Sequence, residues 1–159
     1  MLSPGEKKSE VAVKRLALVQ LKTCERCRQA VAYLMTEDGE HTVGITLDTG
    51  KARELSRNDQ EPEEKFLTDL LLRLLASSSH VPQQVVLDCS QGGSLSAKVV
   101  FTTETFSCSP QEGLVFATAA QIPLYAVERI FEQKHLFHPL DTTGENSDLL
   151  RYKLKPTLH

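Results

Sequence analysis

The segment from Cys108 to Gln133 constrains the fold more than any other, because it encodes a helix, a strand and a second helix without a spacer. Ser109 can act as a helix N-cap, and Pro110 suits the first helical position. Glu112 stands where a capping box places its carboxylate. The residues from Leu114 to Gln121 then carry an apolar face, so we expect a helix that packs against a core.

The remainder of this segment predicts a strand and a short helix. Ile122–Val127 reads IPLYAV, which is too short for a helix of its own, so a buried strand is expected. Glu128 to Gln133 then supplies one or two helical turns.

The N-terminal part of the chain predicts a three-stranded antiparallel meander. Its strands are expected at Val11–Leu21, Ala30–Thr36 and Thr42–Leu47, which are rich in β-branched and aliphatic residues. Cys24 to Cys27 lies in the first turn, and Asp38-Gly39 is a strong signal for the second.

The middle of the chain predicts helices and a hairpin. A short exposed helix is expected within Asp48–Asn58, and a longer helix runs from Pro62 to about Ala76. The apolar stripe of the longer helix consists of Leu67, Leu70, Leu71, Leu74 and Leu75, and its part from Leu70 to Leu75 should be core. Two strands, Gln84–Ser90 and Ser94–Thr103, are joined by a glycine-rich turn, and a third short strand is expected at Thr105–Ser107.

This order of elements predicts one α+β domain over residues 11–133, with a mixed, largely antiparallel sheet and helices packed against it. Residues 1–10 are expected to be a disordered N-terminal segment, and residues 134–159 a C-terminal tail. The expected core, beyond the leucine stripe, consists of Val85, Leu87, Val99, Phe101, Leu114, Phe116, Ile122 and Leu124.

Charge and hydropathy exclude some function classes. The formal net charge of the 159 residues is −3, which supplies no basic footprint for tight nonspecific nucleic-acid binding. No apolar run approaches the roughly 20 residues of a membrane span, and the first ten residues are polar. We therefore expect a cytoplasmic protein without a membrane partner, whose four cysteines are thiols or metal ligands rather than a disulfide framework.

The chain resembles the bifunctional nuclease domain family from Val13 to Gln133. The matching signals are the N-terminal meander, the Thr-Asp-Leu-Leu-Leu helix at Thr68–Leu72, the hairpin pair, and the unit from Ser109 to Gln133. The family signature is Arg-Pro-Ser-Asp-Ala, an apolar helix, then Gly-Ala-Pro-Ile and a hydrophobic residue. The resemblance implies the fold of that family, cleavage of DNA and RNA, and in some members a homodimer.

This sequence departs from the family pattern at several polar positions. Ser109 replaces the signature arginine, and Glu112 replaces the signature aspartate with a longer arm. Where the family has a Glu-Gly pair after the third strand, this chain has Thr49-Gly50. Where the family has a His-Asp pair at the start of the long helix, this chain has Thr68-Asp69. Phosphodiester cleavage draws on cations or a bound metal, and on a base that activates water. The missing arginine and histidine are the positions best suited to those tasks.

Asp69 and Glu112 are the candidate catalytic residues, since both lie near expected helix starts that could converge on the sheet. A divalent metal such as magnesium or manganese is the cofactor expected if the protein is active. The competing interpretation makes Glu112 a capping-box carboxylate and Asp69 a solvated residue that compensates the helix dipole.

The Cys24-x-x-Cys27 motif allows three interpretations. It can be half of a zinc site, which His135 and His138 would complete if the tail folds back, or it can be a redox pair. It can also be an incidental hairpin turn. Cys89 is expected to be buried, and Cys108 stands before a helix start that favours a thiolate.

Four basic residues surround the first hairpin, and a solvated face is the favoured interpretation of them. They are Arg15, Lys22, Arg26 and Arg28. The leading functional hypothesis is a nucleic-acid phosphodiesterase of the bifunctional nuclease domain family. The alternative is a catalytically inactive binding or protein-interaction module of the same fold.

The first two strands carry apolar residues at both odd and even positions, so both of their faces are apolar. This pattern favours burial of the second face in a homodimer. The alternative is that the tail covers this face within one chain, through Leu149, Leu150, Tyr152 and Leu154.

Overall fold

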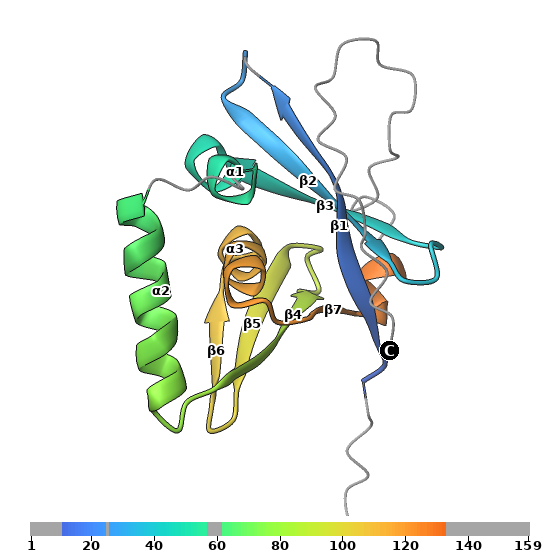
Figure 1. Ribbon diagram of the computed structural model, residues 1–159. Coiled ribbons are helices and arrows are strands. Elements are labelled where there is room, and N and C mark those ends of the chain that lie inside the picture. Colours follow the sequence, from blue (N-terminus) through green and yellow to red (C-terminus); the bar gives the residue numbers. More distant parts are fainter. Residues whose placement is uncertain (1–10, 25, 57–61, 133–159) are drawn as a thin grey trace, which may run out of the picture.

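The computed structural model describes residues 11–24, 26–56 and 62–132, with backbone alone at 62–68. The N-terminal segment 1–10 and the tail 134–159 lie outside the described residues. The described chain forms one mixed sheet with helices packed against it, which confirms the α+β class (Figure 1).

Seven strands form the sheet in the order β3-β2-β1-β7-β4-β5-β6. They are β1 (Val13–Cys24), β2 (Gln29–Thr36), β3 (Thr42–Asp48), β4 (Pro82–Cys89), β5 (Leu95–Phe101), β6 (Thr105–Cys108) and β7 (Leu124–Val127). Strands β1 to β3 make the expected meander, and every pairing in the sheet is antiparallel except the one between β4 and β7.

The short strand β7 joins the two antiparallel halves of the sheet. It pairs antiparallel with β1, where Leu124 faces Leu16, and parallel with β4, where Leu124 faces Val85. Its Ala126 is fully buried. The apolar segment that the sequence predicts as a buried strand is therefore a central strand of the sheet.

Helices α1 (Thr49–Ser56) and α3 (Pro110–Ala120) pack against each other and against the sheet (Figure 1). Helix α1 was expected to be exposed, but its two apolar residues, Ala52 and Leu55, are buried. Two apolar positions three residues apart are enough to turn one side of this short helix into the core. A 3₁₀ turn, η1 (Glu128–Glu132), follows β7 and buries Ile130 completely.

Helix α2 (Pro62–Ser77) does not bury its leucines from Leu70 onward, which the sequence assigns to the core. The side chain of Leu67 lies outside the described residues. Leu71 is 53% exposed and Leu74 is 58% exposed, and Leu70 is exposed as well. In Figure 1, α2 lies at the outer edge of the domain, while α1 and α3 lie closer to the sheet. The helical periodicity was correct, but the sheet face that the stripe would have covered is occupied by α1 and α3.

The rest of the predicted core is confirmed. Val85, Leu87, Val99, Leu114 and Leu124 are buried, and Phe101, Phe116 and Ile122 pack against them while partly exposed. None of the described helices is long and apolar enough to cross a membrane.

Candidate functional site

The start of α3 forms the capping box that its sequence predicts. The backbone N–H and the hydroxyl of Ser109 donate to Oε2 of Glu112 at 3.0 and 2.9 Å, and the backbone N–H of Glu112 donates back to Ser109 Oγ at 3.3 Å. These hydrogen bonds from Ser109 hold the pKa of Glu112 below its usual value, and the nearby charge of Lys51 lowers it further. The Glu112 carboxylate is thus ionised and already bound to the helix start.

Asp69, the second candidate, lies exposed on α2. Among the described residues, no hydrogen bond or ion pair connects the Asp69 carboxylate to Glu112 or to Lys51. The same residues contain no group of three or more His, Cys, Asp or Glu side chains placed to hold a metal ion.

A shallow groove of about 480 Å³ runs beside the start of α3. Its polar lining includes Thr46, Ser94 and Ser109. At its edge, the backbone N–H of Asp48 donates to Oε1 of Gln111 at 3.1 Å, which ties the start of α3 to the junction between β3 and α1. This junction places Lys51, in the first turn of α1, near Glu112.

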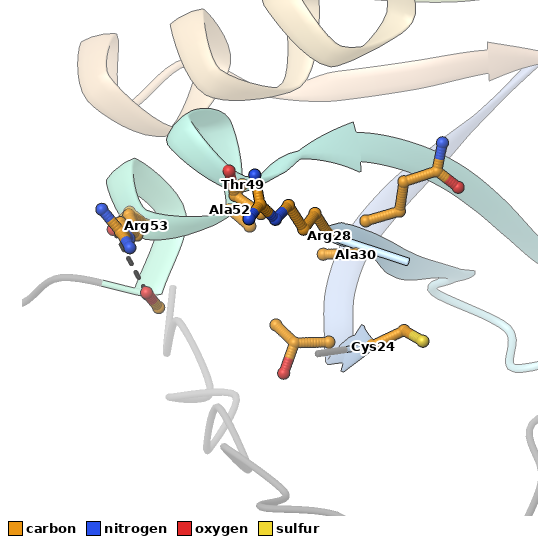
Figure 2. Close-up of a pocket in the computed structure, with 9 residues that line it drawn as sticks. Cys24, Arg28, Ala30, Thr49, Ala52 and Arg53 are labelled. Atoms are coloured by element: carbon orange, nitrogen blue, oxygen red, sulfur yellow. Dashed lines mark hydrogen bonds between the residues drawn. The ribbon is translucent and has the colours of Figure 1, made fainter. Parts of the chain in front are cut away.

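A second and narrower pocket, of about 290 Å³, lies between α1 and the end of the β1–β2 hairpin. Two guanidinium groups line it, one from Arg28 and one from Arg53, and we call it the arginine pocket (Figure 2). The hydroxyl-bearing side chains of Thr23, Thr49 and Ser56 line it as well.

Local backbone geometry brings the two arginines to one pocket. The β1–β2 ladder extends to the pair Cys24 and Gln29, so Arg28 is the last residue of a tight turn, and its φ of 52° is left-handed. Figure 2 shows its side chain extending toward α1, where the guanidinium lies beside Thr49 and Ala52. On α1, Thr49, Arg53 and Ser56 share one helix face because they are spaced by four and three residues.

The sequence alone does not predict the arginine pocket. It places Arg28 in a solvated basic cluster and does not mark Arg53 as a binding residue. The helical spacing of Thr49, Ala52, Arg53 and Ser56 is the signal that could have marked a polar face on α1. The basic cluster itself is not one surface, since Arg15 pairs with Glu37 (Nε to Oε1, 3.6 Å) near the other end of β1.

The Cys24-x-x-Cys27 motif is a disulfide, which corrects the expectation of free thiols or metal ligands. The turn brings the two Cα atoms to 5.6 Å, inside the range that a disulfide requires. The histidines of the zinc interpretation, His135 and His138, lie outside the described residues. The turn is confirmed, and Cys24 also lines the arginine pocket.

The other two cysteines are free thiols. Cys89 is buried, as expected. The expectation of a thiolate at Cys108 is wrong, because burial raises the pKa of its thiol and the negative charge of Glu112 raises it further.

Known proteins do not identify the site. No protein-family model matches the chain, and a search of curated proteins found no match.

Proposed function

We propose that the chain is a divergent member of the bifunctional nuclease domain family that binds nucleic acid, with the arginine pocket as its phosphate-binding site. The observation that carries this proposal is the convergence of Arg28 and Arg53, from segments 25 residues apart in sequence, on one pocket. Neither guanidinium forms an ion pair with any carboxylate of the described residues, so both keep donors for a ligand.

The lining of the pocket suits a phosphodiester. Planar guanidinium groups donate paired hydrogen bonds to phosphate oxygens, and Ser and Thr hydroxyls are common phosphate contacts. None of the described residues that line the pocket is aromatic, so this lining suits the sugar-phosphate backbone of a nucleic acid rather than its bases. We therefore expect binding of single-stranded DNA and RNA with little sequence preference.

The affinity for nucleic acid and its dependence on salt follow from the number of arginines that contact phosphates. Two phosphate contacts on a single strand give a slope of about −1.4 in a plot of log affinity against log salt concentration. A protein of net charge −3 adds little long-range attraction, so the affinity is modest and depends on the pocket itself.

A binding titration tests the pocket directly. Full-length protein is titrated into a fluorescein-labelled single-stranded oligonucleotide at several salt concentrations, and anisotropy is measured. The double variant Arg28→Gln, Arg53→Gln should bind at least tenfold more weakly and lose most of the salt slope. The control is Arg73→Gln, an exposed arginine on α2 that does not line the pocket. Equal affinities of the double variant and the wild type would remove the pocket from nucleic-acid binding.

Cleavage is a second candidate function, supported by the start of α3. Glu112 is ionised there and Lys51 lies near it, and Ser109, which donates to Glu112, lines the groove. In this proposal Asp69 and Glu112 act with magnesium or manganese on the bound phosphodiester. The alternative, binding without cleavage, is supported by the two hydrogen bonds that Oε2 of Glu112 already accepts from Ser109.

A cleavage assay separates the two candidates. Single- and double-stranded DNA and RNA are incubated with the wild type and with the variant Asp69→Asn, Glu112→Gln, with and without magnesium or manganese. Metal-dependent cleavage by the wild type alone would support the catalytic proposal. Equal cleavage by both proteins would exclude these carboxylates, and oligonucleotide binding without cleavage would favour the inactive binding module.

The proposal includes a cytoplasmic homodimer, as the sequence suggests. The exposed Val11 and Val13, together with the half-buried Ala17, Leu18 and Val19, leave apolar surface on β1 and its approach. Light scattering on the full-length protein and on a chain ending at residue 133 tests the assembly. A monomeric full-length protein whose truncation associates would instead assign that surface to the tail.

A further inference from the structure

We propose that Cys24 and Cys27 are a reversible redox pair that sets the anion affinity of the arginine pocket, with the disulfide as the high-affinity form. The inference rests on the proposed function of this pocket and adds its regulation. It is carried by the position of the disulfide, which is both exposed and built into the pocket.

One of the two cysteines lines the pocket, and the other precedes a lining residue in the chain. Cys24 is one of the lining residues, and Cys27 is bonded directly to Arg28 along the chain. Both cysteines are exposed, so a small thiol or a protein dithiol can approach the sulfur atoms. A change of redox state therefore acts within the site and does not need to be transmitted through the fold.

The disulfide contributes little to holding the hairpin together. The β1–β2 ladder already pairs Cys24 with Gln29, so the backbone closes the turn without the covalent bond. The ring formed by residues 24–27 is also short, and the loop-closure entropy that a disulfide removes from the unfolded chain is smallest for short loops. Its opening should leave the domain folded and change the conformation of the turn.

The residue most affected is Arg28. A left-handed conformation is unfavourable for any residue with a side chain, and Arg28 adopts it immediately after the bridged Cys27. When the bridge opens, the restraint on Cys27 disappears, and Arg28 can relax to a right-handed or extended conformation. Its guanidinium then points away from α1, and the pocket loses one of its two cations. Reduction therefore weakens anion binding, because the pocket keeps only one of its two guanidinium groups.

The redox step is thiol–disulfide exchange with a dithiol. A thiolate of the reductant attacks one protein sulfur, breaks the S–S bond and forms a mixed disulfide. The other protein sulfur leaves as a thiolate in this step. The second thiol of the reductant then attacks the reductant sulfur of the mixed disulfide and displaces the protein sulfur that was attacked first. The protein gains two electrons and two protons as two thiols, and the dithiol leaves as a cyclic disulfide.

The experiment measures two ligands in both redox states of the full-length protein. Calorimetry measures the affinity of the pocket for pyrophosphate, without nucleic acid. Anisotropy measures the affinity for the labelled oligonucleotide, which is the ligand of the proposed function. Reduced protein is prepared with dithiothreitol, which is then removed under anaerobic conditions. We expect both ligands to bind on the order of tenfold more weakly to the reduced form, because one or two kcal/mol corresponds to a factor of about 5–30.

Two variants assign the effect to the pair. The variant Cys24→Ser, Cys27→Ser should bind like the reduced wild type and should not respond to dithiothreitol. The matched control, Cys89→Ala, Cys108→Ala, removes the two free thiols and should keep the full redox response. Circular dichroism of each protein verifies that the domain is folded in both states.

The outcomes distinguish the inference from the function on which it rests. Redox-dependent binding of pyrophosphate without any binding of the oligonucleotide would keep the redox control and overturn the nucleic-acid proposal. Equal affinities in both redox states, for both ligands, would overturn the redox control alone. Failure of the oxidised protein to bind either ligand would overturn both.

Discussion

Asp88 on β4 and Arg129 in η1 form a two-point ion pair between residues 41 positions apart. Nε of Arg129 donates to Oδ1 of Asp88 at 2.7 Å, and Nη2 donates to Oδ2. The backbone N–H of Cys89 donates to the same Oδ1. The pair ties the turn after β7 to the neighbouring strand, and the hydrogen bonds from Arg129 are the main reason that the pKa of Asp88 lies below its usual value.

This pair predicts a loss of stability in acid. Because the folded-state pKa of Asp88 lies below the ordinary value of 3.8, its contribution is present above pH 3.8 and is lost as the pH falls through the folded-state pKa. We expect Asp88→Asn to unfold at lower urea concentration at pH 7 and to show a flatter pH dependence below pH 4. The exposed Glu54→Gln is the control. Parallel pH profiles of wild type and Asp88→Asn would contradict this assignment.

The capping box predicts that removing the hydroxyl of Ser109 lowers the stability of the domain. Ser109→Ala removes the acceptor for the backbone N–H of Glu112 and leaves that group without its helix-start partner. We expect the free energy of unfolding to fall by about 1 kcal/mol, measured by urea denaturation. Ser96→Ala, at an exposed position on β5, should change it little. Equal losses in both variants would argue against a specific role of the cap.

Close packing of α3 predicts that Gly113 does not tolerate a side chain. A Cβ at this position would lie 3.0 Å from both the Cβ of Ala97 and Cγ1 of Val85. The Ala97 Cβ cannot move without its backbone, so overpacking should outweigh the helix propensity that alanine adds.

We therefore expect Gly113→Ala to destabilise the domain by about 1–3 kcal/mol in urea denaturation. Gly92→Ala is the control, since its added Cβ would meet only Ser90 Oγ, at 3.7 Å. A stabilised Gly113→Ala protein would show that α3 can shift away from the sheet.

The exposure of α2 predicts that its leucines contribute little to stability. The double variant Leu71→Ser, Leu74→Ser should change the free energy of unfolding by about 0.5 kcal/mol or less per site. Leu87→Ala, at a fully buried position on β4, should cost about 2–5 kcal/mol. Thermal or urea denaturation of the full-length proteins tests both. A large loss in the α2 variant would mean that these leucines are covered in solution.

The sequence by itself determined the order and type of the elements. Turn residues such as Asp38-Gly39 and the alternation of apolar residues predicted the hairpins, because both signals act between neighbours along the chain. The capping residues Ser109 and Glu112 marked the start of α3 for the same reason. The strand at β7 was identified by its length and its apolar composition.

Only the tertiary structure decided which surfaces meet. The leucine stripe of α2 has a correct helical period, but its burial depends on whether the sheet face is free, and α1 and α3 occupy that face. Arg28 and Arg53 line one pocket only because the turn after β1 lies beside the helix after β3. The Cys24–Cys27 disulfide required the turn to set the distance between the two Cα atoms. Local signals specify the conformation of each segment, whereas contacts between distant segments depend on how the whole chain packs, which a local pattern does not encode.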